Sequence, residues 1–174
     1  MINVSQNFLD QSLIDSVLGY YEEAKGKPLF EVNEMGRWHK GLYEGNFGPV
    51  YVMRFPDHIQ EQIVAKTKTI SDSSDYEFGT TFLHIWQPGS GINWHMDSVD
   101  GMERIGMTIY LNKEWSVNWG GIFLWEKDGT TGWIKPQYNC AVWFKSPLWH
   151  SVSLITRAAI EPRISIQIFL NKKQ

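Results

Sequence analysis

The second half of the chain is punctuated by turn-forming residues at short, regular intervals, and this pattern constrains the fold more than any other feature. Beyond Ser71, short runs of β-branched and aromatic residues alternate with Gly, Pro, Asn and Asp. Regularly spaced short strands with turn signals such as Asp128-Gly129 are typical of a β-sandwich or barrel. We therefore predict strands at residues 78–86, 105–111, 121–125, 130–134, 141–144, 151–154 and 163–169.

The first 70 residues show a helical periodicity instead. Apolar residues recur every fourth position, which predicts an amphipathic helix with the stripe Leu9, Leu13, Val17 and Tyr21. Asn7 is a candidate cap for this helix. A second helix is predicted at residues 57–70, where Asp57 and Gln60 form the start signal.

The domain organisation follows from the length and from the lack of internal boundaries. The chain has 174 residues, no internal repeat and no Pro/Ser-rich linker. We predict a single domain over residues 1–174, mainly β with N-terminal helices. The helical support covers about residues 1–70 and the β core about residues 78–170.

Charge and cysteine content exclude several classes of protein. Sixteen basic and nineteen acidic residues give a net charge of −3 without a basic stripe, so a nucleic-acid partner is not expected. The single cysteine, Cys140, excludes an internal disulfide and a thiolate metal cluster. The longest uncharged stretch, residues 80–96, contains Pro88 and glycines and cannot be a membrane-spanning helix. Without a secretory pattern at the start, we expect a cytoplasmic protein that does not bind membranes; the oligomeric state is not predicted.

His95 and Asp97 form the first candidate for chemistry. They follow a turn-forming stretch at residues 88–91 and are two positions apart in a short extended segment. In a strand this spacing points both side chains to the same face, with Cα atoms roughly 7 Å apart. One small cation can accept both side chains, although an H-x-D pair alone also arises by chance.

His150, at the start of another predicted strand, supplies a third ligand type. Two imidazoles and one carboxylate cover one face of an octahedron and leave three positions open, as in non-haem Fe(II) oxygenases. The alternative is that both histidines are ordinary hydrogen-bonded residues and that Asp97 caps the loop at residues 98–101.

Arg163 opens a strand whose two faces differ sharply. One face carries Arg163, Ser165, Gln167 and Phe169, and the other carries only isoleucines. If the isoleucines pack against the helices, the guanidinium lies inside the sandwich, where it needs an anionic partner. A dicarboxylate would bridge the gap between Arg163 and the metal. The alternative is that Arg163 lies on an exposed face.

Taken in order, these residues resemble the Fe(II)- and 2-oxoglutarate-dependent dioxygenase superfamily, in its prolyl 4-hydroxylase-like branch. The resemblance covers roughly residues 78–170. Its elements are His95-x-Asp97, the Y-L-N-K-E-W segment from Tyr110, the Gly120-Gly121 strand, Pro136, His150 and Arg163. It implies a double-stranded β-helix, a jelly-roll or cupin-like barrel supported by helices.

The resemblance also implies an enzyme and its cofactors. His95, Asp97 and His150 would be the catalytic metal ligands for Fe(II), and Arg163 with Tyr110 would bind 2-oxoglutarate as cosubstrate. The reaction would consume O2, release succinate and CO2, and hydroxylate an unactivated C–H bond, with a prolyl residue in a peptide or protein as the first expectation. Ascorbate is a possible additional cofactor. Ser165 resembles the second member of the R-x-S pairing of other members.

Three alternatives remain open at this point. The substrate could instead be a free amino acid or other small molecule, or an alkylated nucleobase, which the acidic net charge disfavours. The third alternative is a non-catalytic jelly-roll domain that binds a metal without turnover. Asp97 favours hydroxylation over halogenation, because related halogenases have a small residue at this position.

Several further residues carry secondary expectations. Residues 33–48 are a candidate lid or an irregular surface hairpin, and Asn139 replaces a family glycine in a turn that Asn tolerates. Three tryptophans near the ligands are candidates for a shield or for plain core packing: Trp86, Trp94 and Trp149. Three histidines lack partners at ligand spacing and are predicted to be structural: His39, His58 and His84.

Overall fold

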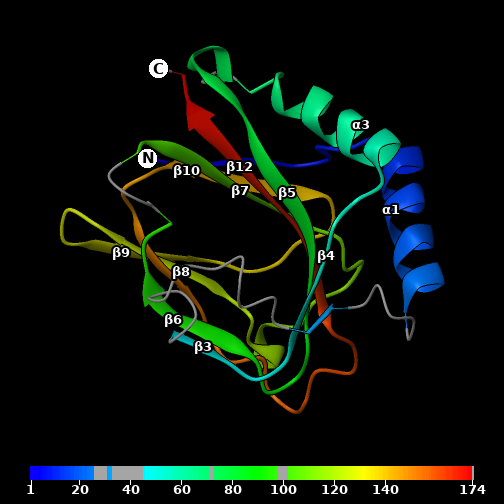
Figure 1. Cartoon of the computed structure of the whole chain (residues 1–174). Helices are drawn as coiled ribbons and strands as arrows, with labels where there is room; N and C mark the ends of the chain where they lie inside the picture. The colour runs from blue at the N-terminus through cyan, green and yellow to red at the C-terminus, as the bar shows by residue number, and fades with distance from the viewer. Residues whose placement is uncertain (26–30, 33–44, 71–72, 98–101, 174) are drawn as a thin grey trace.

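The computed structural model describes residues 1–25, 31–32, 45–70, 73–97 and 102–173. Its strands form two antiparallel sheets that face each other (Figure 1). The seven-stranded sheet has the order β1 (Ile2–Ser5), β10 (Cys140–Lys145), β7 (Arg104–Tyr110), β12 (Arg163–Lys172), β5 (Tyr76–Trp86), β4 (Val50–Met53) and β2 (Glu31–Val32). The five-stranded sheet has the order β3 (Asn46–Phe47), β6 (Gly91–His95), β11 (Trp149–Val152), β8 (Phe123–Lys127) and β9 (Thr130–Ile134).

The two sheets form the double-stranded β-helix expected from the resemblance, with one correction. Over the described residues they are not closed into a barrel by strand pairing. Each predicted strand overlaps an observed one, because period-two alternation and turn residues delimit these segments in the sequence.

Two helices cover the outer face of the seven-stranded sheet, α1 (Gln11–Ala24) and α3 (Asp57–Thr67) (Figure 1). Apolar side chains of both helices pack against the sheet, where Ile166 and Ile168 of β12 are fully buried. The isoleucine face of β12 therefore packs on the helical side, as the alternation predicts. Two short 3-10 turns, η2 (Ser73–Asp75) and η3 (Val117–Trp119), complete the elements.

The N-terminal region differs from prediction at several points. Asp10, not Asn7, is the N-cap of α1, because the helix begins at Gln11; Asn7 lies before it with a left-handed backbone, φ of 53°. The second helix ends at Thr67 rather than at residue 70. This region also contributes strands that were not predicted, since β1 pairs with β10 and β4 pairs with β5. Both are four-residue segments, too short for periodicity to assign.

Asn139 holds the turn before β10 in the left-handed region, with φ of 51°, which confirms that Asn serves in place of glycine. Its side chain accepts a hydrogen bond from the Leu9 N–H and donates one to the Leu9 carbonyl, both at 2.8 Å. The turn thus ties the start of α1 to the sheet.

The candidate lid and His39 fall largely or wholly on residues 33–44, which lie outside the described residues. In the described ranges, no helix has both the length and the apolar character that a membrane span requires.

Candidate active site

Strand pairing brings the three predicted metal ligands together. His95 ends β6 and His150 lies opposite it on β11, while Asp97 follows β6 by two residues. The ligand atoms of the three side chains all lie within 4.8 Å of one another. All three side chains line one cavity between the two sheets. In the described part of the chain, no other cluster of His, Cys, Asp and Glu meets these metal-site criteria.

The geometry points the free imidazole nitrogens at a common point. Asp97 Oδ1 lies 3.5 Å from His95 Nε2, and Asp97 Oδ2 lies 3.3 Å from His150 Nε2. The Nδ1 atoms contact backbone carbonyls instead, at 2.8 Å to Asn93 and 3.0 Å to Leu148. An Nδ1–H that donates to a carbonyl leaves the Nε2 lone pair free for a metal.

The electrostatics of the group favour a cation. Burial raises the pKa of the Asp97 carboxyl, but His150 and His95 more than offset this and hold it well below its usual range. Burial lowers the pKa of His150, but Asp97 outweighs it and the pKa is raised overall. A buried carboxylate between two imidazoles, without a thiolate, fits a divalent ion that prefers nitrogen and oxygen ligands, such as Fe(II).

Gly106 on β7 makes room for Asp97. A Cβ at this position would lie 3.2 Å from Asp97 Oδ2 and 3.1 Å from Phe144 Cζ. Both distances are tighter than ordinary contacts, so a side chain here would displace the carboxylate or the ring. This role of Gly106 was not predicted from the sequence, where its only signal is a glycine inside a strand, which often marks a close approach.

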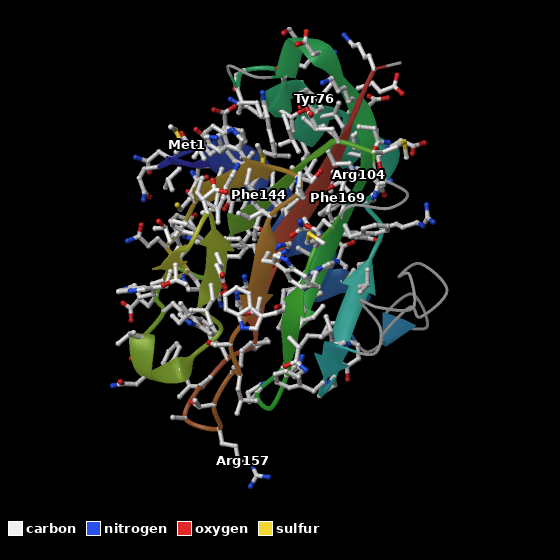
Figure 2. All side chains as sticks on the ribbon, turned by 90° about the vertical axis from the view of Figure 1, so that its left-hand side faces the viewer. Met1, Tyr76, Arg104, Phe144, Arg157 and Phe169 are labelled. Carbon is white, nitrogen blue, oxygen red and sulfur yellow. The ribbon has the colours of Figure 1, made fainter. Side chains whose placement is uncertain are left out.

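The cavity has a volume of about 180 Å³ and runs along β12. Arg163, Ser165, Gln167 and Phe169 all line it, as predicted for the polar face of that strand. Figure 2 shows the side chains between the sheets, with Phe144 and Phe169 labelled. Phe82, Phe123 and Phe144 add apolar walls that limit water.

Arg163 is buried without an acidic partner in the described part of the chain. Its side chain is 2% exposed, and its Nε atom has no hydrogen-bond partner. The guanidinium lies 4.9 Å from the centre of the Tyr110 ring, and Nη1 donates a long hydrogen bond of 3.5 Å to Ser165. Burial lowers the pKa of Arg163, although guanidinium stays charged in proteins. A buried cation without an acidic partner among the described residues is suited to an anionic ligand.

Tyr110 lies beneath this guanidinium. It is fully buried, and its hydroxyl has no hydrogen-bond partner. Burial raises the pKa of the phenol, so the hydroxyl remains a donor near neutral pH. Tyr110 is not among the residues that line the cavity.

His84 lines the cavity on β5, between Phe82 and Trp86. A structural role was predicted for His84, because no other candidate ligand lies at ligand spacing from it in the sequence. Burial, together with the nearby Arg163, lowers the pKa of His84 to about 3, so the imidazole is neutral. In the sequence, the position of His84 two residues before Trp86 indicates that both side chains lie on the same face of the strand.

The three tryptophans have different environments. Trp86 is buried and lines the cavity, whereas Trp94 and Trp149 are 46% and 48% exposed. A shielding or core role for Trp94 and Trp149 is therefore wrong. Each is the strand neighbour of an inward histidine, and alternation turns it outward.

Comparison with known proteins adds a family and a set of similar structures. The family model of the 2OG-Fe(II) oxygenase superfamily matches residues 80–171. A search of curated proteins gives no match.

The similar solved structures share the fold at low sequence identity. A prolyl-4-hydroxylase from Pseudomonas putida aligns with a TM-score of 0.74 and 17% identity, over 99% of this chain and 93% of the other. A Trichoplax adhaerens prolyl hydroxylase, in complex with a hypoxia inducible factor peptide fragment, aligns with a TM-score of 0.75 and 15% identity, over 98% and 83%. A viral collagen prolyl hydroxylase from Paramecium Bursaria Chlorella virus-1 aligns with a TM-score of 0.67 and 16% identity, over 97% and 95%.

Proposed function

Because this chain belongs to the 2OG-Fe(II) oxygenase superfamily, we propose that it hydroxylates a prolyl residue in a peptide or protein, with release of succinate and CO2. It is a 2-oxoglutarate-dependent dioxygenase with a prolyl 4-hydroxylase-like fold. The observation that carries the proposal is one cavity that holds a largely buried His-Asp-His group and a buried arginine without an acidic partner in the described residues.

In this proposal His95, Asp97 and His150 hold Fe(II) through His95 Nε2, His150 Nε2 and a carboxylate oxygen. The backbone carbonyls of Asn93 and Leu148 fix both rings by accepting from Nδ1. When bound, Fe(II) with 2-oxoglutarate and O2 supplies the oxidising power that cleaves an unactivated C–H bond. Ascorbate, as a reductant that keeps the iron ferrous, belongs to the same proposal.

Arg163 and Tyr110 bind the cosubstrate. The guanidinium holds the far carboxylate of 2-oxoglutarate, and the Tyr110 hydroxyl donates to the same carboxylate. The Arg163 Nε and the Tyr110 hydroxyl are buried and have no hydrogen-bond partner among the described residues. A bound carboxylate supplies a partner to each of them. The phenylalanine walls exclude water and orient the substrate carbon.

The prolyl substrate is supported by the fold of the similar proteins. Three of them are prolyl hydroxylases, and one was solved with a peptide bound.

The first test uses the purified protein with Fe(II) and 2-oxoglutarate in the absence of oxygen. A visible charge-transfer band of the metal-chelated ketoacid is expected. If folded protein shows no band, the chain is a binding domain without this chemistry, and the proposal fails.

The second test addresses the substrate. Aerobic incubation with proline-rich peptides, followed by mass spectrometry, should detect peptides that carry one added oxygen. Matched peptides with alanine in place of proline serve as the control. If neither set of peptides is modified by protein that shows the charge-transfer band, the proposed prolyl substrate is wrong, whereas the assignment as a dioxygenase stands.

A further inference from the structure

The hairpin of β8 and β9 leaves one edge of the five-stranded sheet open. β9 is the last strand of that sheet and pairs with β8 alone among the described strands (Figure 1). The other described edge strands are shorter, since β1 has four residues and β2 and β3 have two each, whereas β9 has five. An edge strand presents unpaired N–H and C=O groups that can pair with another chain. β9 is therefore the longest open edge in the described part of the chain.

The turn between the two strands fixes which backbone groups of β9 point outward. Asp128 and Gly129 both have positive φ, 51° and 72°, as in a two-residue type I′ turn. The residues on either side of such a turn form a hydrogen-bonded pair of the ladder. Hydrogen-bonded and non-hydrogen-bonded pairs then alternate along the two strands. Thr131 and Trp133 therefore direct their N–H and C=O groups away from β8.

β9 lacks the features that protect edge strands from association. It carries no proline and no charged side chain over residues 130–134, and its register with β8 contains no bulge. Its threonines, Trp133 and Ile134 are residue types that favour strands. The Trp133 side chain is 64% exposed on the outer face of the sheet. An uncharged, partly apolar edge of this kind is suited to pairing with a further strand.

The strand is complementary to itself about Gly132. When two copies of β9 lie antiparallel with a two-fold axis at Gly132, Thr131 of each copy faces Trp133 of the other. Each of these two pairs forms two hydrogen bonds, because both residues have outward N–H and C=O groups. Gly132 meets Gly132 of the second copy as a non-hydrogen-bonded pair, the kind with the closer Cα approach of about 4.5 Å. A glycine suits this position, since the Trp125 indole occupies the space that a Cβ would need.

The same arrangement complements charge and apolar surface. It places the half-buried Lys135 opposite Gly129 of the second copy, one residue from the exposed Asp128 of that copy. Symmetry produces this contact between opposite charges twice. The two copies of Trp133 take diagonal positions on the outer face, within reach of each other's rings. Charge complementarity and the covering of an exposed tryptophan thus favour a second copy of this chain as the strand that pairs with β9.

We propose that the chain forms a homodimer in which β9 of two copies pairs antiparallel about Gly132, so that the two five-stranded sheets become one continuous sheet. The pairing supplies four backbone hydrogen bonds, contact between two tryptophans and two contacts between opposite charges. An interface this small is typical of weak, reversible association, with a dissociation constant on the order of 10 µM. The dimer is independent of the dioxygenase assignment, because no metal ligand and no proposed cosubstrate ligand takes part in it.

Sedimentation velocity from about 1 to 500 µM protein tests for the dimer, whose share should grow with concentration. Thr131→Pro removes one outward N–H per copy and leaves the bonds to β8 in place, so two of the four hydrogen bonds across the interface are lost. This variant should dimerise at least about tenfold more weakly than the wild type. Thr131→Ala keeps the N–H, serves as the matched control and should dimerise as the wild type does. Circular dichroism and thermal unfolding check that both variants are folded.

Charge variants test the register of the two strands. Asp128→Lys places two basic side chains at each end of the interface, and Lys135→Glu places two acidic ones there. Each variant alone should dimerise at least about fivefold more weakly than the wild type. An equimolar mixture should restore association, because the mixed dimer has opposite charges at both ends. These changes affect only exposed or half-buried side chains, so they test the interface even where Thr131→Pro does not fold.

Three results would overturn the proposal. The first is a wild-type protein that stays monomeric up to about 500 µM. The second is a dimer that folded Thr131→Pro leaves intact, because association then uses another surface. The third is a mixture of Asp128→Lys and Lys135→Glu that associates no more tightly than either variant alone, because the two-fold register about Gly132 is then wrong.

Discussion

His150 lies directly opposite His95 on the neighbouring antiparallel strand, and their ring centroids are 4.2 Å apart. Strands β7 to β10 separate the two residues in the sequence, so the register of β6 and β11 alone brings them together. A slip of one residue would turn His150 to the outer face, where Trp149 now lies. The metal site is therefore a consequence of strand register.

The first prediction concerns Asp97. Replacement by Ala removes the carboxylate that lies between the two imidazoles, and leaves two ligands for the metal. We expect Asp97→Ala to abolish succinate formation and to reduce bound iron, measured by metal analysis after desalting. Asp15→Ala, at an exposed position on α1, is the control and should retain both succinate formation and bound iron. Unchanged turnover in Asp97→Ala would remove Asp97 from the metal site.

The second prediction separates stability from binding at Arg163. An uncompensated buried guanidinium destabilises the cosubstrate-free protein, so Arg163→Met should raise its free energy of unfolding by roughly 1–4 kcal/mol. The same change should eliminate the stabilisation that 2-oxoglutarate confers on the Fe(II)-loaded wild type. Urea unfolding with and without 2-oxoglutarate measures both effects. Arg157→Met should change neither, and a less stable Arg163→Met protein that still binds 2-oxoglutarate would contradict the assignment.

The third prediction concerns the hydroxyl of Tyr110. Because this buried hydroxyl has no hydrogen-bond partner among the described residues, Tyr110→Phe should leave the stability of the cosubstrate-free protein nearly unchanged. The affinity for 2-oxoglutarate should fall roughly tenfold, since one hydrogen bond to a carboxylate is lost. Titration of the charge-transfer band measures this affinity. Tyr138→Phe, whose hydroxyl bonds Gln11 at the surface, is the control and should not differ from wild type.

The parts of this protein that the sequence predicts are those governed by local rules. Alternation along residues 163–169 assigns Arg163 to the cavity and the isoleucines to the helices, because a strand has only two faces. The i, i+2 spacing of His95 and Asp97 likewise requires nothing beyond an extended backbone. His150 was predicted from its residue type and its place at the start of a predicted strand, and the family resemblance supported it, since spacing cannot identify its partner strand.

The remaining features depend on contacts between distant segments. Gly106 leaves space for the Asp97 carboxylate. His84 and Arg104 are part of the site only because the fold places them in the same cavity as the metal ligands. Their local patterns are those of any strand residue. The outward orientation of Trp94 follows from its place beside His95, which shows that proximity in sequence to a ligand is a poor guide to proximity in space.

The fourth prediction uses the pKa of His84, which is lowered to about 3 by burial and the nearby Arg163. An unfolded chain protonates this imidazole below its ordinary pKa of 6.5, whereas the folded protein keeps it neutral down to a pH of about 3. The unfolded state therefore binds more protons between these values, and stability is lost as the pH falls. The contribution is at most about 1.4 kcal/mol per pH unit.

Urea unfolding of the metal-free protein across this pH window measures that slope. His84→Asn should show a shallower loss of stability on acidification than the wild type. His58→Asn, at an exposed position on α3, should retain the wild-type slope. Identical slopes for wild type and His84→Asn would mean that the imidazole becomes charged in the folded protein.

The fifth prediction concerns Asn139, whose left-handed backbone and two side-chain hydrogen bonds to Leu9 contribute separately. Asn139→Gly keeps the backbone conformation but loses both bonds, and should cost roughly 1–3 kcal/mol of unfolding free energy. Asn139→Ala also loses the bonds and adds the strain of a positive φ, for a further cost of about 1 kcal/mol. Asp128 has the same φ of 51° in the hairpin between β8 and β9, without hydrogen bonds to α1. Asp128→Gly should therefore change stability by less than about 0.5 kcal/mol, and an equal loss at both sites would assign the effect to the backbone rather than to the bonds with Leu9.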